Sequence, residues 1–168
     1  MSNLEKTVIT KTELQDVQET LITLINSFPE LPEQVKKDGV SLENLKPKNV
    51  SMCLSTVLNP YKVRVDIDGS YLAKYQFKII FQTMDTNNNQ RIDSQALLSK
   101  IGEWLEGRTL ALNSGLTYEM GDYPSLSDGR RIIKLCKDTI PKLVYRLPSN
   151  IEVSEAKFTL EYYVKNDF

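Results

Sequence analysis

The sequence predicts an α+β fold, with a mainly antiparallel sheet of about four to five strands packed by two amphipathic helices. Three observations carry this prediction. Two stretches repeat apolar residues at helical spacing, a run over residues 61–82 alternates as strands do, and a last alternating strand closes the chain. The length of 168 residues suits one core, so we expect a single domain over 1–168.

The first helix is predicted over about residues 13–27, after a capping box formed by Thr12 and Gln15. The apolar residues of one helical face follow: Leu14, Val17, Leu21, Leu24 and Phe28. Pro29 and Pro32 end the run, and residues 29–49 then lack a clear period. This segment is predicted to be a connector with room for one short helical turn.

Residues 51–58 alternate as a strand, and Asn59-Pro60 is expected to end it. The predicted hairpin over 61–82 turns at Ile67-Asp68-Gly69. A two-residue turn would mix the polar and apolar faces, so we predict a bulged three-residue loop with Gly69 in the left-handed conformation. This register pairs Val65 with Tyr71, Val63 with Ala73, and Tyr61 with Tyr75.

The second helix is predicted over residues 94–106, capped by Asp93 or Ser94, with Trp104 as a core anchor in its apolar stripe. An Asn-rich loop over 85–90 precedes it. A long loop over 107–130 follows, with at most one short strand, and C-terminal strands are predicted over 131–165.

Composition narrows the classes of function. The net charge is −1 and there is no histidine, which excludes Ser-His-Asp and Cys-His catalysis and His-ligated metal sites. The balanced charge gives no general attraction to nucleic acid or to an anionic membrane. Cys53 and Cys136, each among apolar residues, are predicted to be free core thiols rather than a disulfide.

The N-terminus lacks the features of a signal peptide, and no apolar run has the length of a membrane span. We therefore expect a soluble chain that is not exported, does not act as an enzyme and uses no cofactor or metal. A protein partner is the expected kind of ligand.

Three segments could carry other chemistry. Asp85, Asn87, Asn89 and Asp93 fall at ligand positions of a calcium loop, but Gln90 replaces its glycine and Ala96 its bidentate glutamate. A polar loop leading into a helix is the favoured interpretation, and a calcium- or ligand-responsive module the alternative.

Asp66 and Asp68 are interpreted as turn residues rather than as a catalytic pair, and a hydrolase using carboxylates alone is the least favoured hypothesis. The basic stretch from Arg130 to Arg146 is interpreted as the solvated side of a strand pair rather than a phosphate-binding surface.

The order of elements and two passages carry a family resemblance. The passages are "YKVRVDIDGSYLAKYQFKIIFQ" with "RIDSQALLSKIGEWLEG", and the closing "DTIPKLVYRLPSNIEVSEAKFTLEYYV". Over about residues 10–165 the chain resembles the minor capsid, or tail terminator, family of long-tailed bacteriophages and prophages of Gram-positive bacteria.

The resemblance implies a hexameric ring of identical subunits on the end of the phage tail. Such a ring stops polymerisation of the tail tube protein and offers a surface to the head-tail connector protein. It also implies assembly in the bacterial cytoplasm and a place in the virion tail. As exposed loop residues for these contacts we predict Asp85, Asn87, Asn88, Asn89, Tyr118 and Tyr123.

Overall fold

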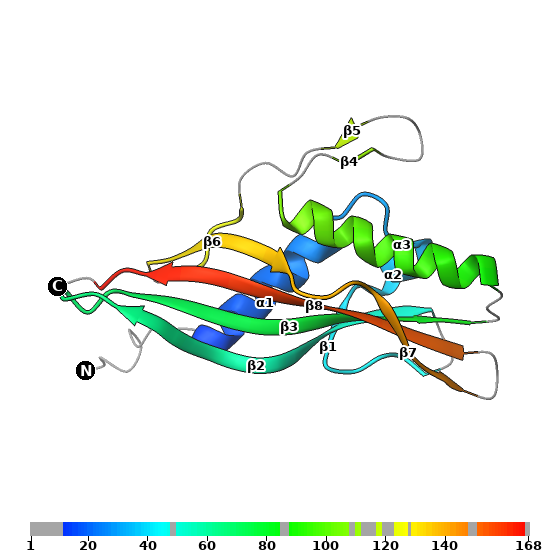
Figure 1. The fold of residues 1–168 in the computed structure, drawn as a ribbon, viewed down its shortest axis with the longest axis horizontal. Coiled ribbons are helices and arrows are strands. Elements are labelled where there is room, and N and C mark those ends of the chain that lie inside the picture. The colour runs from blue at the N-terminus through cyan, green and yellow to red at the C-terminus, as the bar shows by residue number, and fades with distance from the viewer. Residues whose placement is uncertain are drawn as a thin grey trace, which may run out of the picture.

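The computed structural model describes residues 12–47, 50–84, 88–107, 110–111, 117–118, 123–127, 129–147 and 151–166. Within these ranges the chain combines helices with a mixed six-stranded sheet, an α+β fold (Figure 1). The strand count exceeds the predicted four to five, because the connector contributes a short strand of its own.

The sheet has the order β1-β2-β3-β8-β6, and β7 also pairs with β8. The strands are β1 (Ser41–Leu42), β2 (Ser51–Val65), β3 (Tyr71–Thr83), β6 (Arg130–Lys137), β7 (Lys142–Leu147) and β8 (Ile151–Val164). Of the strand pairs that the structure describes, β1–β2 alone is parallel. The strands β6 and β7 lie one after the other along β8, and both pair with it antiparallel.

The strand β2 runs through the point where the sequence predicted a break. Pro60 lies inside β2, and the register against β3 shifts between Thr56 and Leu58, between Leu58 and Tyr61, and between Lys62 and Arg64. Proline is tolerated on an edge strand and at bulges, where its missing N–H removes no bond of the ladder. The prediction that Asn59-Pro60 ends the strand was therefore wrong.

The predicted three-residue turn is confirmed. The Asp66 N–H donates to the Ser70 carbonyl at 2.7 Å, and Gly69 has φ +88°. Val65 pairs with Tyr71 as expected. The two further predicted pairs were wrong, because the bulge near Val63 moves Lys62 opposite Ala73.

The described residues form the helices α1 (Glu13–Asn26), α2 (Glu33–Asp38) and α3 (Asn88–Leu105). The capping box of α1 is present, with the Gln15 N–H donating to the Thr12 hydroxyl at 3.2 Å. The helix α2 is the helical turn foreseen in the connector. The predicted start of α3 near residue 94 was wrong by more than one turn, so Asp93 and Ser94 lie inside the helix rather than capping it.

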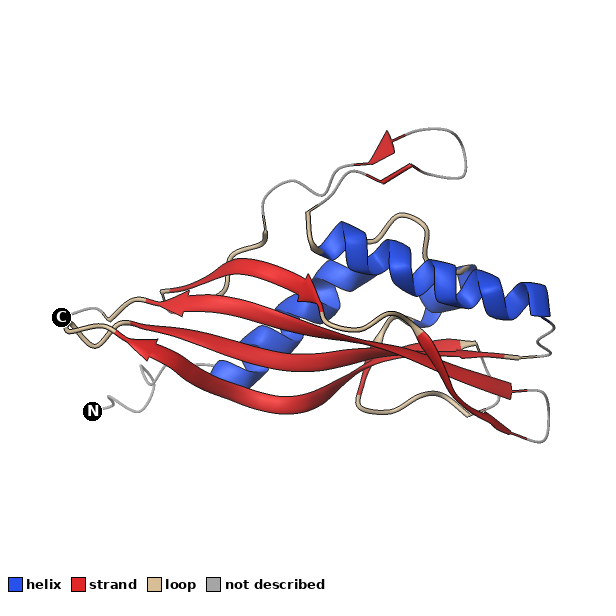
Figure 2. Cartoon of the chain, viewed as in Figure 1, coloured by secondary structure: helices blue, strands red, loops and turns tan. Residues whose placement is uncertain are grey.

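One hydrophobic core joins the helices to one face of the sheet (Figure 2). On the sheet side this core contains Ala73, Tyr75, Phe77, Ile79, Phe158, Leu160 and Tyr162, all fully buried. Trp104 is 1% exposed and packs edge to face on Phe28 with 5.3 Å between ring centroids, so its predicted role as a core anchor is confirmed.

The segment after α3 contains two short paired strands, β4 (Leu110–Ala111) and β5 (Thr117–Tyr118), where the sequence predicted at most one. Two-residue strands are too short to produce an alternating pattern, which is why the sequence did not reveal them. Both cysteines are free thiols; Cys53 is buried and Cys136 half-buried.

Candidate protein-interaction surfaces

The predicted contact residues belong to two segments of the chain, one at the start of α3 and the other around β5. Asp85 and Asn87 lie outside the described residues, whereas Asn88 and Asn89 belong to the first turn of α3. Tyr118 lies on β5, opposite Leu110. A role of these residues in partner contacts stays a prediction.

Tyr123 is half-buried rather than an exposed loop residue. Its hydroxyl donates to the Leu105 carbonyl at 2.7 Å and accepts the Leu135 N–H at 3.3 Å. Burial raises the pKa of Tyr123, so its hydroxyl stays protonated at neutral pH. Tyr123 therefore ties the segment after β5 to the end of α3 and to β6.

The outer edge of β6 is covered from within the molecule. Besides the contact from Tyr123, the Lys137 N–H donates to the Glu106 carboxylate at 3.3 Å, and Ser125 forms a bridge with Arg131. Unpaired strand edges are templates for another chain, and covering them is a usual protection. We call this covered side the β6 edge.

A buried acid, Asp16 on α1, holds the covering segment in place. Asp16 is 2% exposed and accepts the N–H of Ser127 at 2.8 Å, the Ser127 hydroxyl at 3.0 Å, and the Arg130 guanidinium at 3.0 Å. These charge-assisted bonds satisfy a carboxylate that would be costly to bury alone. Arg130 consequently turns inward, and its predicted place on a solvated face was wrong.

Next to Asp16, Glu13 joins the start of α1 to the sheet. Its carboxylate accepts hydrogen bonds from the hydroxyls of Tyr71 and, at 2.6 Å, Tyr162. Burial and the neighbouring Glu13 carboxylate raise the pKa of Tyr71 to about 12, and the same two causes raise that of Tyr162. Both tyrosines therefore remain hydrogen-bond donors at neutral pH.

Among the described residues, only the first part of β2 has cover on its outer side, which is the opposite edge of the sheet. The strand β1 pairs with Cys53 and Leu54, and the side chain of Glu43 binds the next two residues of β2. The Glu43 carboxylate accepts the Thr56 N–H and the Ser55 hydroxyl, each at 2.9 Å.

These contacts affect Glu43 and its neighbour Cys53. Burial alone would raise the pKa of Glu43, but the bonds from Thr56 and Ser55 outweigh it and hold that pKa below its usual value. Glu43 itself adopts φ +67°, an unusual conformation for a residue with a side chain. Burial, followed by the charge of Glu43, raises the pKa of Cys53 to about 11, so this thiol is inert at neutral pH.

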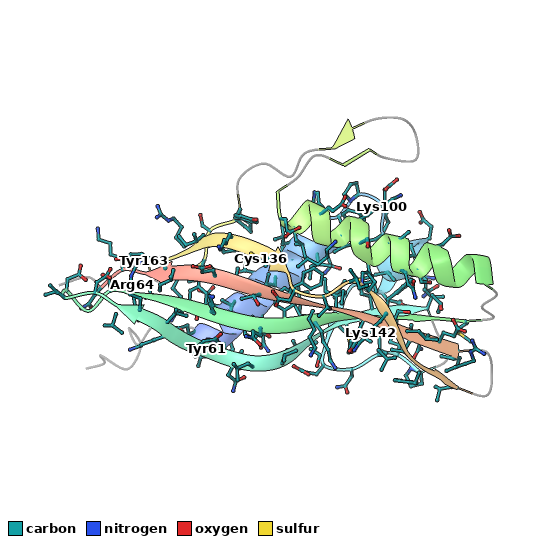
Figure 3. The ribbon with its side chains drawn as sticks, viewed as in Figure 1. Tyr61, Arg64, Lys100, Cys136, Lys142 and Tyr163 are labelled. Atoms are coloured by element: carbon teal, nitrogen blue, oxygen red, sulfur yellow. The ribbon has the colours of Figure 1, made fainter. Side chains whose placement is uncertain are left out.

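Beyond Thr56, no strand among the described residues pairs with the outer side of β2. Five large apolar side chains of this half are 37–59% exposed: Val57, Leu58, Tyr61, Val63 and Val65. We call them the β2 surface, and Figure 3 shows Tyr61 on this half of the strand. Such a row on an open edge is typical of a site that another strand covers.

A second apolar group lies at the other end of the sheet. Ile140 is 78% exposed, and on β7 Val144, Tyr145 and Leu147 are 41–46% exposed. We call these four residues the β7 surface. Beside it lies an open cavity of about 360 Å³, with Cys53, Ile80 and Val153 among its lining residues.

The carboxylates considered for catalysis take part in the hairpin turn. Asp68 accepts the Ser70 N–H at 2.9 Å, and this bond is the main cause that lowers the pKa of Asp68. Asp66 accepts the Tyr163 hydroxyl at 3.0 Å and pairs with Arg64 at 3.2 Å. The turn role predicted for Asp68 is confirmed.

The calcium interpretation concerns residues 85–96. Asn89 and Asp93 lie on helical backbone, and the strand β3 rather than a helix precedes the segment. Calcium loops of this type hold those positions in a loop between two helices. In the part of the chain that the structure describes, no group of three or more His, Cys, Asp or Glu residues could hold a metal ion.

No protein-family model matches the sequence, and no curated protein matches it. Of the helices that the structure describes, none is both long and apolar enough to cross a membrane.

Proposed function

We propose that this chain is a structural assembly protein, a tail terminator of a long-tailed phage or prophage. In this proposal identical subunits form a hexameric ring on the tail tube, end its polymerisation and present the surface that meets the head-tail connector. The protein acts in the virion tail after assembly in the bacterial cytoplasm. Two amphipathic helices packed on the sheet, as the resemblance implies, provide a rigid subunit for such a ring.

The observation that carries the proposal is the β7 surface. Its four apolar side chains are too exposed to contribute to the core, and they lie together on a short edge strand and the residues before it. Contiguous exposed apolar groups on a small domain mark contact sites for other proteins. A ring subunit needs such contacts, whereas an enzyme working alone does not.

The proposal is tested with the double variant Val144→Ser, Tyr145→Ser, in an assay that measures the length of tubes grown from the phage's tail tube protein. The natural chain is expected to limit tube length, and the variant to lose this effect. Ile67→Ser is the matched control, because Ile67 is fully exposed at the opposite hairpin tip. The circular dichroism of the variant must match that of the natural chain. Tubes that grow unchecked in the presence of the natural chain would contradict the proposal.

A further inference from the structure

We propose that one face of the sheet binds a single-stranded nucleic acid through its phosphate backbone, without reading the base sequence. This face belongs to β2, β3, β6 and β8 and lies opposite the hydrophobic core. The inference goes beyond the tail-terminator proposal and does not rest on it, since it follows from the charges and rings on one side of the sheet.

The face lies on the side of the sheet away from the helices that the structure describes. On β3 the buried rings of Tyr75 and Phe77 belong to the core, and successive side chains of a strand point to opposite faces. Lys74, Gln76 and Lys78 therefore point away from the core. In Figure 1 the helix α1 passes behind the sheet, so this face is turned toward the viewer.

This face is rich in positive charge, and we call it the basic face. Directly paired residues of neighbouring strands share a face. The register therefore assigns six cations to it: Arg64, Lys74, Lys78, Arg131, Lys134 and Lys157. The same strands carry two acids on this face, Glu155 and Glu161, and two more, Asp66 and Asp138, follow β2 and β6. Cations are therefore in excess here, although the whole chain has a net charge of −1.

Half of these cations have no acidic partner. Three pair with acids over 3.1–3.5 Å: Lys78 with Glu155, Arg64 with Asp66, and Lys134 with Glu161. In the part of the chain that the structure describes, no ion pair forms at Lys74, Arg131 or Lys157. Lys157 also lies directly opposite Lys78, and like charges in that position destabilise a sheet. An anionic ligand lying across these side chains would relieve that repulsion.

The centre of the basic face differs from a typical protein contact. Gln76 lies opposite Thr159 there, between Lys74 and Lys78 along β3. Protein interfaces have a more apolar centre and are depleted in lysine. Phosphate groups, in contrast, accept charge-assisted hydrogen bonds from lysine and arginine. The face therefore fits a nucleic-acid backbone better than an acidic protein.

Two tyrosines favour a single strand over a duplex. Tyr61 lies opposite Lys74 and is 37% exposed. Tyr163 lies opposite Arg131. Figure 3 labels both tyrosines, which lie on the two strands that flank β3. Bases of a single strand stack on aromatic side chains that lie among cations, whereas the bases of a duplex are already stacked on each other.

Fluorescence anisotropy of a labelled oligothymidine of about 16 nucleotides measures this binding on the full chain. The double variant Lys74→Glu, Lys157→Glu should bind at least about tenfold more weakly, because two phosphate contacts become repulsive. The plot of log binding constant against log salt concentration should also be less steep by about 1.4.

The matched control is Lys36→Glu, Lys37→Glu, which changes the net charge equally on α2, a helix packed on the core side of the sheet. Its binding should change by less than about twofold, because salt screens exposed charges that are far from the ligand. Lys74→Gln, Lys157→Gln is the milder second variant in case the glutamates disturb folding, and it should weaken binding in the same direction.

Equal weakening by the two glutamate variants would overturn the proposal, because the attraction would then not come from the basic face. Absence of oligothymidine binding at low salt would overturn it as well. Tighter binding of the duplex form, or of polyglutamate, would overturn it in favour of a duplex or of an acidic protein.

Discussion

The two edges of the sheet differ in how they are closed. The β6 edge is covered by the side chain of Glu106, just after α3, by Tyr123 and by the bridge at Ser125, all within one chain. The β2 edge is closed only as far as Thr56, where the Glu43 carboxylate replaces a neighbouring strand. Apolar side chains remain exposed where this cover ends.

The difference shows that the domain's own residues protect one edge of the sheet and leave part of the other edge exposed. The cover of β6 is anchored by Asp16, a residue buried in the core layer, so it belongs to the folding unit. The open half of β2 has bulges and Pro60, which discourage pairing with a foreign strand but do not bury its valines. Among the described residues, the β6 edge is therefore closed by contacts within the domain, whereas the β2 edge stays open from Val57 to Val65.

The largest expected effect comes from breaking the anchor of the β6 cover. Asp16→Ala leaves Arg130 without its closest partner, and losing one member of a buried ion pair costs about 3–5 kcal/mol. The free energy of unfolding in urea measures this loss. Glu33→Ala is the control, because Glu33 on α2 is exposed and its loss should leave stability close to unchanged. A small effect at Asp16 would mean that the cover does not depend on this anchor.

A smaller effect is expected from Tyr123→Phe. The change leaves the Leu105 carbonyl and the Leu135 N–H without their partner, which costs about 1–3 kcal/mol. The Leu135 amide should also exchange faster, because the β6 edge opens there. Tyr61→Phe on the β2 side is the matched variant, and its exposed hydroxyl should contribute less than about 0.5 kcal/mol.

At the tip beside the open edge, Gly69→Ala should cost about 1–2 kcal/mol, because φ +88° is unfavourable for a residue with a side chain. A Cβ there would also come within 2.4 Å of the Asn166 amide. The double variant with Asn166→Ala separates the two causes by thermal unfolding. Should the double variant regain full stability, the backbone conformation would not be the cause.

The last effect is absent at neutral pH and is expected at alkaline pH only. Tyr71 has its pKa raised to about 12 in the folded state, against about 10 in an unfolded chain. Its contribution to stability is complete below pH 10 and is lost as the pH rises towards 12. Tyr71→Phe should therefore flatten the fall of the unfolding free energy over that range. An unchanged slope would contradict the raised pKa.

Local patterns predicted much of the fold. Thr12 with Gln15 located the start of α1, Gly69 located the hairpin turn, and Trp104 located the core of α3. These signals depend on a few neighbouring residues, so they can be recognised without knowing the tertiary contacts. The sequence could not predict that β2 continues through Pro60. A strand tolerates proline at a sheet edge or at a bulge, and the position of a strand in the sheet is not visible in the sequence.

The candidate surfaces were harder to predict. The contact of Asp16 with Arg130 joins residues 114 positions apart, and a single sequence carries no signal for such a pair. Tyr123 was predicted to be exposed because its segment lacks periodicity, yet its hydroxyl binds the end of α3. The sequence showed that Val63 and Val65 alternate with polar residues. It could not show that both are exposed, because that depends on which strand of the sheet lies at the edge.

We propose that this chain assembles into a ring, and light scattering of the purified protein over a concentration series tests for that ring. We expect a species with six times the 19.2 kDa chain mass, formed alone or on added tail tubes and unchanged by EDTA. A monomer at every concentration that also fails to bind tail tubes would contradict the claim. A mass that changes with EDTA would contradict it too, in favour of a calcium-dependent module.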